Sequence, residues 1–444
     1  MSSPMQNLKT FMQRNVLKVK QLEISSTSFK GTTFVIGNEA GDADSIISSL
    51  TYAYLKHFLS LHDEGQPKIA RLRMPVIPII SVRRDEAHLR RDVELLLAEV
   101  DLQLSDLICL DECHISRLAS DNKLDLILVD HNVLSSSVSA KLGEKEHSDD
   151  MIKEILDHHE DGCCHLSASV REIAFDSEKM KPGVASTCTI VAEKFLEPQN
   201  IEALTSDIAT LLIAVIALDS LNMDPMIKRG TPRDKHALDS LQLMFPKIER
   251  DRLFGMLTNA KTDPIFWEAL SARDAVRIDR KDFAFKKETD FGVTDAKGDG
   301  LYAISSVLQS ASSFLRKSDL DKVLQNTFYC TKREAADCNE ESPSSTVPAD
   351  LLVIMGLELF PSIRRSLLFF SPSEKRLRNL STYLAINCTD MKLSTLVTEP
   401  DYPASRSLDG GDVHMLAFDQ GNTDLSRKQI APIVSKFYET PYNK

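Results

Sequence analysis

The sequence lacks an excess of positive charge. Its 53 lysines and arginines are outnumbered by 65 aspartates and glutamates, which gives a formal net charge of -12 at pH 7. No basic tail or polybasic block offsets this balance. General binding to nucleic acid or to an acidic membrane depends on such cations, so we expect neither partner. An anionic substrate would need a local group of lysines and arginines.

The sequence also lacks a long apolar run. The longest stretch, Ile208 to Leu218 with Thr210 inside it, is too short to cross a bilayer. Residues 1–20 mix cations with polar residues and contain no continuous apolar core, which excludes a secretory signal. We expect a helix there, with a mitochondrial presequence as the alternative. These features predict a soluble, cytoplasmic protein.

Cysteine pairs with the spacing of a structural zinc site are missing as well. The eight cysteines are scattered along the chain, as expected for reduced thiols in a cytosolic protein. Two groups could be drawn as zinc ligands, Cys109-x3-Cys113-His114 and Cys163-Cys164-His165. Neither has a second pair at the customary distance, so the zinc interpretation is disfavoured.

The length of 444 residues exceeds what one hydrophobic core usually fills, so two domains are expected. We place the boundary near residue 245, where Phe245-Pro246 interrupts a predicted helix, giving domains 1–245 and 246–444. Apolar segments that read as strands alternate with helical patterns across residues 30–240. This alternation predicts an α/β fold with a doubly wound parallel sheet. The predicted strands are Thr32 to Ile36, Met74 to Val82 at a sheet edge because of its prolines, Leu124 to Val129, and Ile152 to Leu156.

Four apolar segments are each followed directly by residues with carboxylate, amide or imidazole side chains. The polar groups that follow them are Gly37-Asn38 with Asp42-x-Asp44-Ser45, then Asp130-His131-Asn132, then Asp157-His158-His159, then Asp219. The carboxyl ends of parallel strands meet at one edge of a sheet, and ligands bind there. Helix capping would explain one aspartate after the first strand, but two aspartates and Asn38 in one loop exceed that need.

The chemistry of these side chains suits a divalent metal. Carboxylate and amide oxygens with a few imidazole nitrogens are ligands for Mg²⁺ or Mn²⁺. Two ions that share a carboxylate can lower the pKa of a bridging water and hold a phosphoryl group. Without a metal, so many like charges would repel one another. For any single acid, solvation of a strand end is the alternative explanation. The predicted ligands are Asn38, Asp42, Asp44, Asp130, His158 and Asp219.

Two further patterns are open to either of two interpretations. The turn Pro182-Gly183-Val184-Ala185-Ser186-Thr187 enters a predicted helix, and its amides could bind an anion or belong to an ordinary capped helix. Arg83, Arg84, Arg90 and Arg91 could steer phosphate or form a solvated basic helix face. The sequence alone favours the plainer interpretation in each case.

The series of polar motifs resembles the four motifs of the DHH phosphoesterase superfamily. In the second half, Asp279-x-Lys281 and Ser426-Arg427-Lys428-Gln429 are similar to the DHH-associated domain of one branch. That branch contains family II inorganic pyrophosphatases, prune proteins and exopolyphosphatases, and the chain looks most like the exopolyphosphatase of yeast type. The resemblance implies a doubly wound DHH domain, a smaller α/β DHH-associated domain, and an active site in the cleft between them.

The resemblance also implies a role for each residue. Asn38 and Asp42 would bind one metal, and Asp44, His158 and Asp219 would bind the other. Asp130 would bridge both metals and, with His159, act in catalysis, His159 contacting the phosphate under attack. The residues that would bind phosphate oxygens from the second domain are Lys281, Arg427 and Lys428.

The implied activity is that of a metal-dependent exopolyphosphatase, which releases terminal orthophosphate from linear polyphosphate by attack of metal-bound hydroxide. The alternatives are a prune-like hydrolase of short polyphosphates or nucleotides, an inorganic pyrophosphatase, and a non-catalytic prune-like interaction protein. Family II pyrophosphatases carry histidine where this chain has Asn38, and an amide oxygen is a harder ligand than imidazole. We therefore expect Mg²⁺ to serve, where the relatives with histidine would favour Mn²⁺ or Co²⁺. The sequence does not indicate an oligomeric state.

Overall fold

The chain folds into two compact units, Met1–Lys261 and Thr262–Lys444, each described here by itself. The structure, a computed structural model, describes residues 7–24, 31–62, 75–113, 115–121, 124–142, 148–286, 299–329, 348–359, 362–396 and 403–440. A break does follow Met244, the last residue of α10 (Pro232–Met244). Helix α11 (Arg250–Thr262) nevertheless belongs to the first unit, because its Leu253 and Leu257 are buried in that unit's core. The boundary between the two units therefore lies further along the chain than the position near residue 245 that the sequence suggested.

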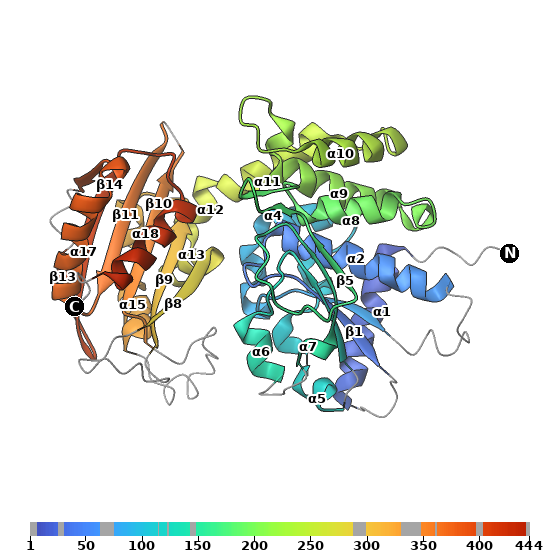
Figure 1. Cartoon of the computed structure of the whole chain (residues 1–444), viewed down its shortest axis with the longest axis horizontal. Helices are drawn as coiled ribbons and strands as arrows, with labels where there is room; N and C mark the ends of the chain where they lie inside the picture. Colours follow the sequence, from blue (N-terminus) through green and yellow to red (C-terminus); the bar gives the residue numbers. More distant parts are fainter. Residues whose placement is uncertain are drawn as a thin grey trace. The chain divides into compact units, whose positions relative to one another are not determined.

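The first unit is built on a five-stranded sheet in the order β2-β1-β3-β4-β5, with all neighbours parallel. Figure 1 labels β1 and β5 of this sheet. The strands are β1 (Thr32–Ile36), β2 (Val76–Ile79), β3 (Leu124–Val129), β4 (Ile152–Asp157) and β5 (Val170–Ile173). β2 lies at an edge, as its prolines predicted. The edge strand β5, only four residues long and partly exposed, was not anticipated.

Helices cover both faces of this sheet. Phe34 and Ile36 of β1 belong to one buried cluster, and Val35 between them belongs to the other. The cluster around Val35 includes residues of α2 (Ala43–His62), α4 (Arg91–Ala98), α8 (Thr187–Leu196), α9 (Ser206–Asp219), α10 and α11. The opposite cluster includes residues of α5 (Ile115–Ser120) and α6 (Ser136–Leu142). Helix α1 (Leu8–Ile24) contributes to both. The predicted doubly wound α/β fold is thus confirmed.

One predicted element is wrong. Of the four apolar segments that were expected to end at the edge of the sheet, the one before Asp219 is not a strand but the C-terminal part of helix α9. The run from Ile208 to Leu218 is almost entirely buried, so it shows no polar face that would reveal a helical period. Thr205 caps the helix by accepting a hydrogen bond from the Ile208 N–H at 3.3 Å. The length of the run was the signal for a helix.

The second unit contains a mixed sheet in the order β12-β14-β11-β10-β9-β8, with β13 paired to β14. Only β9 and β10 are parallel among these pairs. The strands are β8 (Arg280–Lys286), β9 (Asp299–Val307), β10 (Leu351–Glu358), β11 (Arg364–Ser371), β12 (Leu393–Thr395), β13 (Ser405–Leu408) and β14 (Gly411–Gln420). Helices α17 (Glu374–Asn387) and α18 (Arg427–Glu439) share a buried cluster with one face of the sheet.

The other face of the second sheet meets α13 (Ala272–Ile278), since Ser305 of β9 donates a hydrogen bond to the Val276 carbonyl of that helix. The remaining short elements are α7 (Ser148–Met151), β6 (Phe175–Asp176), β7 (Lys181–Pro182), α12 (Pro264–Ala269), α14 (Ala311–Leu315) and α15 (Leu320–Phe328). Among the residues that the structure describes, no helix combines the length and the apolar character needed to span a membrane.

Candidate metal centre

The candidate site lies where the strand order of the first sheet reverses. From β1 the chain passes to β2 on one side and then to β3 on the other side of β1. Such a switch point opens a crevice at the carboxyl ends of the strands. Asn38 follows β1 and Asp130 follows β3, and the Asn38 amide donates to Asp130 Oδ2 at 2.6 Å. The structure therefore brings these two predicted residues into direct contact.

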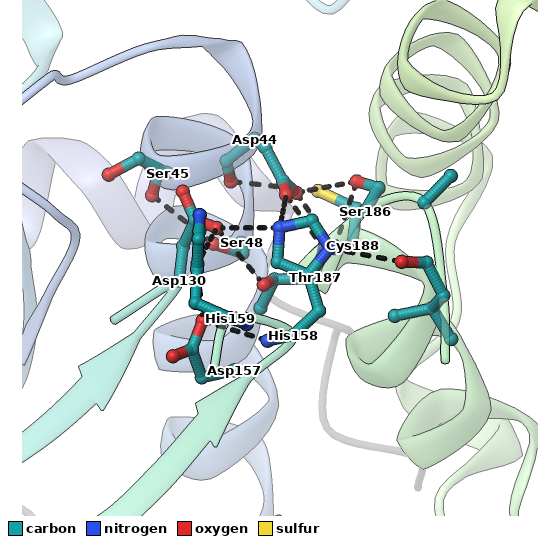
Figure 2. Close-up of polar contacts among 12 residues, drawn as sticks. Asp44, Ser45, Ser48, Asp130, Asp157, His158, His159, Ser186, Thr187 and Cys188 are labelled. Atoms are coloured by element: carbon teal, nitrogen blue, oxygen red, sulfur yellow. Dashed lines mark hydrogen bonds and ion pairs between the residues drawn. The ribbon is translucent and has the colours of Figure 1, made fainter. Parts of the chain in front are cut away.

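Asp130 is the residue on which the cluster converges. Its side chain is buried, and its backbone has φ of 63°, a left-handed conformation that aspartate tolerates better than most residues. Asp130 Oδ1 lies 3.3 Å from His158 Nε2 and accepts a hydrogen bond from the Thr187 hydroxyl at 3.2 Å. Figure 2 shows Asp130 among residues from α2, from the end of β4 and from the start of α8. Burial, and then the charge of Asp44, raises the pKa of Asp130 well above its ordinary value.

His158 follows β4 and points one ring nitrogen at the acids. Its Nδ1 donates to the Val184 carbonyl at 3.1 Å, which leaves Nε2 toward Asp130 and 3.8 Å from Asp44 Oδ2. A backbone carbonyl that holds one nitrogen while the other faces acidic ligands is typical of metal-binding histidines. Burial lowers the pKa of His158, but the hydrogen bond to Asp130 and the charge of Asp44 outweigh it and raise the pKa to about 10.

His159 is oriented by a neighbour to which the sequence assigned no role. Asp157 is fully buried, and its Oδ1 accepts from His159 Nδ1 at 2.8 Å and from the His159 N–H at 3.2 Å. The Asn132 side-chain amide donates a hydrogen bond to the other oxygen, Asp157 Oδ2, at 2.6 Å. Burial raises the pKa of Asp157, but its hydrogen bonds to His159 and Asn132 outweigh this and lower it. His159 itself remains 53% exposed, so the opposite edge of its ring is accessible.

Asp44 lies in the first turn of α2, and its carboxylate reaches the turn that enters α8. Its carboxylate accepts hydrogen bonds from the Thr187 N–H at 2.7 Å, the Cys188 N–H at 2.9 Å and the Ser186 hydroxyl at 2.5 Å. The amides that the sequence offered to an outside anion therefore bind a carboxylate of the same chain (Figure 2). This is a helix N-terminus stabilised by a negative charge. The arrangement fixes Asp44 beside His158.

Asp42 and Asp219 complete the acidic set in different ways. Asp42 caps α2, since its Oδ1 accepts from the Ser45 N–H at 3.1 Å, so the capping explanation applies to this residue. Asp219 is the last residue of α9, and its Oδ2 is buried without a hydrogen-bond partner among the described residues. Burial and the charge of Asp44 raise the pKa of Asp219, and Asp42 adds to this effect.

These donors fit a divalent cation. One ligand atom each from Asp130, His158 and His159 lie within 4.8 Å of one another. The unpaired buried oxygen of Asp219 and the raised pKa of Asp130 both indicate more negative charge than the surrounding protein balances. A bound cation would supply that balance, and mixed carboxylate and imidazole ligands suit ions such as Mn²⁺ and Mg²⁺. The residues that could hold it also include Asn38, Asp42 and Asp44.

The loop with Asn38 and Asp42 is held by an arginine for which the sequence suggested another role. Arg90 is buried and donates from Nε to the Gly41 carbonyl and from an Nη to the Ala40 carbonyl, both at 2.7 Å. It is therefore neither a phosphate-steering residue nor part of a solvated face. Arg84 pairs with Glu112 at 2.7 Å, which also gives it a structural partner.

The predicted phosphate-binding cations belong to the second unit. Arg427 starts α18, and its Nη1 donates to the Asp279 carbonyl at 2.6 Å and lies 2.7 Å from Asp279 Oδ1. Lys281 stands two residues beyond Asp279 on β8 and is exposed, as is Lys428. Ser426 and Gln429 form a capping box at the start of α18, which explains these two residues of the motif structurally.

Comparison with known proteins agrees with this architecture. A structure of a family II inorganic pyrophosphatase from Methanococcus jannaschii, itself described as putative, superposes with a TM-score of 0.50 at 18% sequence identity, covering 92% of this chain and 100% of that chain. At this identity the likeness shows a shared fold.

Sequence relatives carry a consistent set of names. Exopolyphosphatase PRUNE1 of Rattus norvegicus is 28% identical over 410 residues, covering 90% of this chain and 74% of that protein. A protein of Schizosaccharomyces pombe named as a putative exopolyphosphatase is 24% identical over 434 residues, covering 95% and 94%. Residues 32–216 match the DHH family, N-terminal domain. The matched residues include the polar motifs that gather at the switch point of the doubly wound sheet, so this part of the chain is similar to the DHH family.

Proposed function

We propose that this protein is a metal-dependent exopolyphosphatase that releases terminal orthophosphate from linear inorganic polyphosphate. The observation that carries the proposal is the buried cluster of Asp44, Asp130 and His158 at the switch point of the sheet. The similarity of residues 32–216 to the DHH family, together with the names of the relatives, supports phosphoanhydride hydrolysis as the chemistry of this site. The choice of polyphosphate is supported by the names of the rat and S. pombe relatives.

Two divalent cations, with Mg²⁺ preferred because of Asn38, are part of the proposal. Asn38 and Asp42 would hold one, Asp44, His158 and Asp219 the other, and Asp130 both. When bound, such ions activate water and neutralise phosphoryl oxygens. The chain contributes the fixed positions of its ligands, since Thr187 and Asn38 hold the Asp130 carboxylate and the Val184 carbonyl holds His158.

His159 is the residue proposed to contact the terminal phosphate. Its Nδ1 is engaged by Asp157, so Nε2 is the atom left to bind a phosphate oxygen or to transfer a proton. Its half-exposed ring suits a group that must meet a substrate. Lys281, Arg427 and Lys428 are proposed to bind further phosphate oxygens from the second unit, where cations would neutralise the charge that spreads over the phosphoryl group. Asp279 holds Nη1 of Arg427 and thereby limits the orientation of its guanidinium.

The proposal is tested by orthophosphate release from purified protein with Mg²⁺. Long polyphosphate, tripolyphosphate, pyrophosphate and a cyclic nucleotide are compared, with Asp130→Ala as the inactive control. We expect rapid release from long chains, none from pyrophosphate, and none in the variant. Preference for tripolyphosphate, pyrophosphate or the nucleotide would assign the protein to one of the sister activities. No metal-dependent turnover of any substrate would favour a non-catalytic interaction protein.

The choice of metal needs a separate measurement. The protein is treated with a chelator, dialysed, and supplied with Mg²⁺, Mn²⁺ or Co²⁺ at matched free concentrations. We expect full activity with Mg²⁺, because the Asn38 oxygen is a hard ligand. Activity with Mn²⁺ far above that with Mg²⁺ would contradict this part of the proposal. Asn38→His is the matched variant, and it should shift the preference toward Mn²⁺.

A further inference from the structure

One peptide group connects His158 to a buried acid outside the acidic cluster. The carbonyl of Val184 accepts from His158 Nδ1 at 3.1 Å. The N–H of the next residue, Ala185, donates to both carboxylate oxygens of Asp234 at 3.0 and 2.9 Å. In a planar trans peptide the C=O and the following N–H point in opposite directions. The Val184-Ala185 peptide is therefore held on one side by the histidine and on the other by Asp234.

Asp234 is itself firmly held. It is fully buried in the first turn of α10. Its Oδ1 accepts from the Thr189 hydroxyl at 2.6 Å, and its Oδ2 accepts from the Thr231 N–H at 2.8 Å. These bonds join α8 and α10 to the turn between β7 and α8. A carboxylate held by Thr189 and Thr231 can in turn fix the rotation of the peptide that donates to it.

We infer that Asp234 is a positioning residue for His158. By fixing the Val184-Ala185 peptide, Asp234 aims the Val184 carbonyl at His158 Nδ1, and this bond turns His158 Nε2 toward Asp130 and Asp44. The inference rests on the proposed metal centre. Partners that orient a ligating histidine typically change metal affinity by about 10- to 100-fold when they are removed.

Helix capping is the competing explanation for Asp234. Asp234 and Thr231 form a capping box at the start of α10, in which Thr231 accepts from the Asp234 N–H at 3.4 Å. Of these two residues, only Asp234 also binds the Ala185 N–H. Thr231→Ala therefore removes the hydroxyl half of the capping box and leaves both the bond from the Thr231 N–H to Asp234 and the contact with the peptide. It is the matched control for Asp234→Asn, which keeps the size of the side chain but places an NH₂ group where one acceptor oxygen stood.

The experiment measures Mn²⁺ binding to the full-length, metal-free protein by calorimetry, together with thermal unfolding. We expect Asp234→Asn to weaken Mn²⁺ binding by about 10- to 100-fold. Thr231→Ala should lower the unfolding temperature but leave Mn²⁺ affinity unchanged. Thr189→Val removes one restraint on the Asp234 carboxylate and should give a smaller loss of affinity. It also provides a folded variant if Asp234→Asn does not fold.

A second readout follows His158 directly. In the metal-free parent protein, nitrogen-resolved NMR should show a His158 Nδ1–H signal protected from solvent exchange by the Val184 carbonyl. Exchange should become faster in Asp234→Asn and stay slow in Thr231→Ala. Unchanged Mn²⁺ affinity and unchanged exchange in the folded Asp234 and Thr189 variants would overturn the inference.

The inference and the proposed activity can fail separately. If the parent protein releases orthophosphate from polyphosphate and Asp234→Asn binds Mn²⁺ as the parent does, the inference is wrong and the function stands. If the parent hydrolyses no polyphosphate but Asp234→Asn still loses Mn²⁺ affinity, the positioning role stands and the substrate must be sought elsewhere. The Mn²⁺ and NMR measurements require no turnover, which keeps the two outcomes distinct.

Discussion

The two units of the chain place opposite charges in opposite surroundings. The first unit buries its acids, with Asp44 6% and Asp130 2% exposed, and packs them against one another. The second unit leaves Lys281 and Lys428 exposed. Burial of like charges is costly unless a partner compensates, whereas exposed cations cost little. The buried acids are the part of the molecule where a cation would supply missing charge, whereas the two lysines lie at the surface of the second unit.

This comparison predicts the largest effect for Asp130→Asn. Removing the charge on which the cluster converges should lower kcat with Mg²⁺ by about 10³-fold or more, because an electrostatic centre of the reaction is lost. Mn²⁺ binding, measured by calorimetry, should weaken in parallel. The metal-free variant should unfold at the same temperature as the parent or higher, since repulsion from Asp44 is relieved. A lower unfolding temperature would mean that the cluster is primarily structural.

The second prediction separates the two histidines. His159→Asn should lower kcat by about 10²-fold, in the range typical of general acid or base groups, because Asp157 holds Nδ1 of His159 and leaves Nε2 for the proposed contact with phosphate. Mn²⁺ affinity should stay the same, in contrast to His158→Asn, which should lose it. Equal losses of Mn²⁺ affinity in His158→Asn and His159→Asn would instead show that His159 is a metal ligand.

The third prediction concerns the cations of the second unit. Arg427→Ala should raise KM for polyphosphate by about 10-fold, as expected for loss of a charge-assisted hydrogen bond, and leave the dependence on Mg²⁺ concentration unchanged. Lys436→Ala on the same helix is the matched control, because Lys436 lies near the other end of α18. If Arg427→Ala changed the dependence on Mg²⁺ concentration, it would contradict the idea that the first unit binds metal and the second binds phosphate.

The smallest effect on catalysis is expected for the arginine that holds the acidic loop. Arg90→Lys keeps the charge but cannot reproduce both hydrogen bonds to the Gly41 and Ala40 carbonyls. Urea unfolding should show a loss of about 1 to 2 kcal/mol, and kcat should fall only slightly. Arg91→Lys, at the exposed neighbouring position, serves as the control. Equal stability of the two variants would show that Arg90 does not hold the loop.

Much of the fold could be predicted from local patterns. The strands β1, β3 and β4 are short, mostly buried segments rich in β-branched and leucine residues, and Pro78 marked β2 as an edge. The prediction was wrong where a pattern was ambiguous. The C-terminal part of α9 is uniformly apolar, so its sequence shows no helical periodicity. The break at Phe245 suggested a domain boundary, but the next helix, α11, packs into the hydrophobic core of the first unit.

The sequence also indicated which residues gather at the site, but not the contacts that hold them. Asn132 and Asp157 belong to the polar motifs, but the sequence assigned no role to them. Asp234 is an ordinary polar residue when viewed along the chain, and Arg90 resembles a surface cation. Each is positioned by partners from distant segments, as in the contact between Asp234 and Ala185, which are 49 residues apart. Local propensity contains no information about such pairings.

The sequence by itself determined where polar side chains interrupt apolar strands, because hydrophobic runs and their ends are local properties of the chain. Capping of α2 by Asp42 is equally local, since donor and acceptor are three residues apart. Only the tertiary structure decided that Asp44, two residues later, binds the start of α8, 142 residues away at Ser186. That choice depends on the crossing of the chain at the switch point between β1 and β3, which brings the helix to the buried carboxylate.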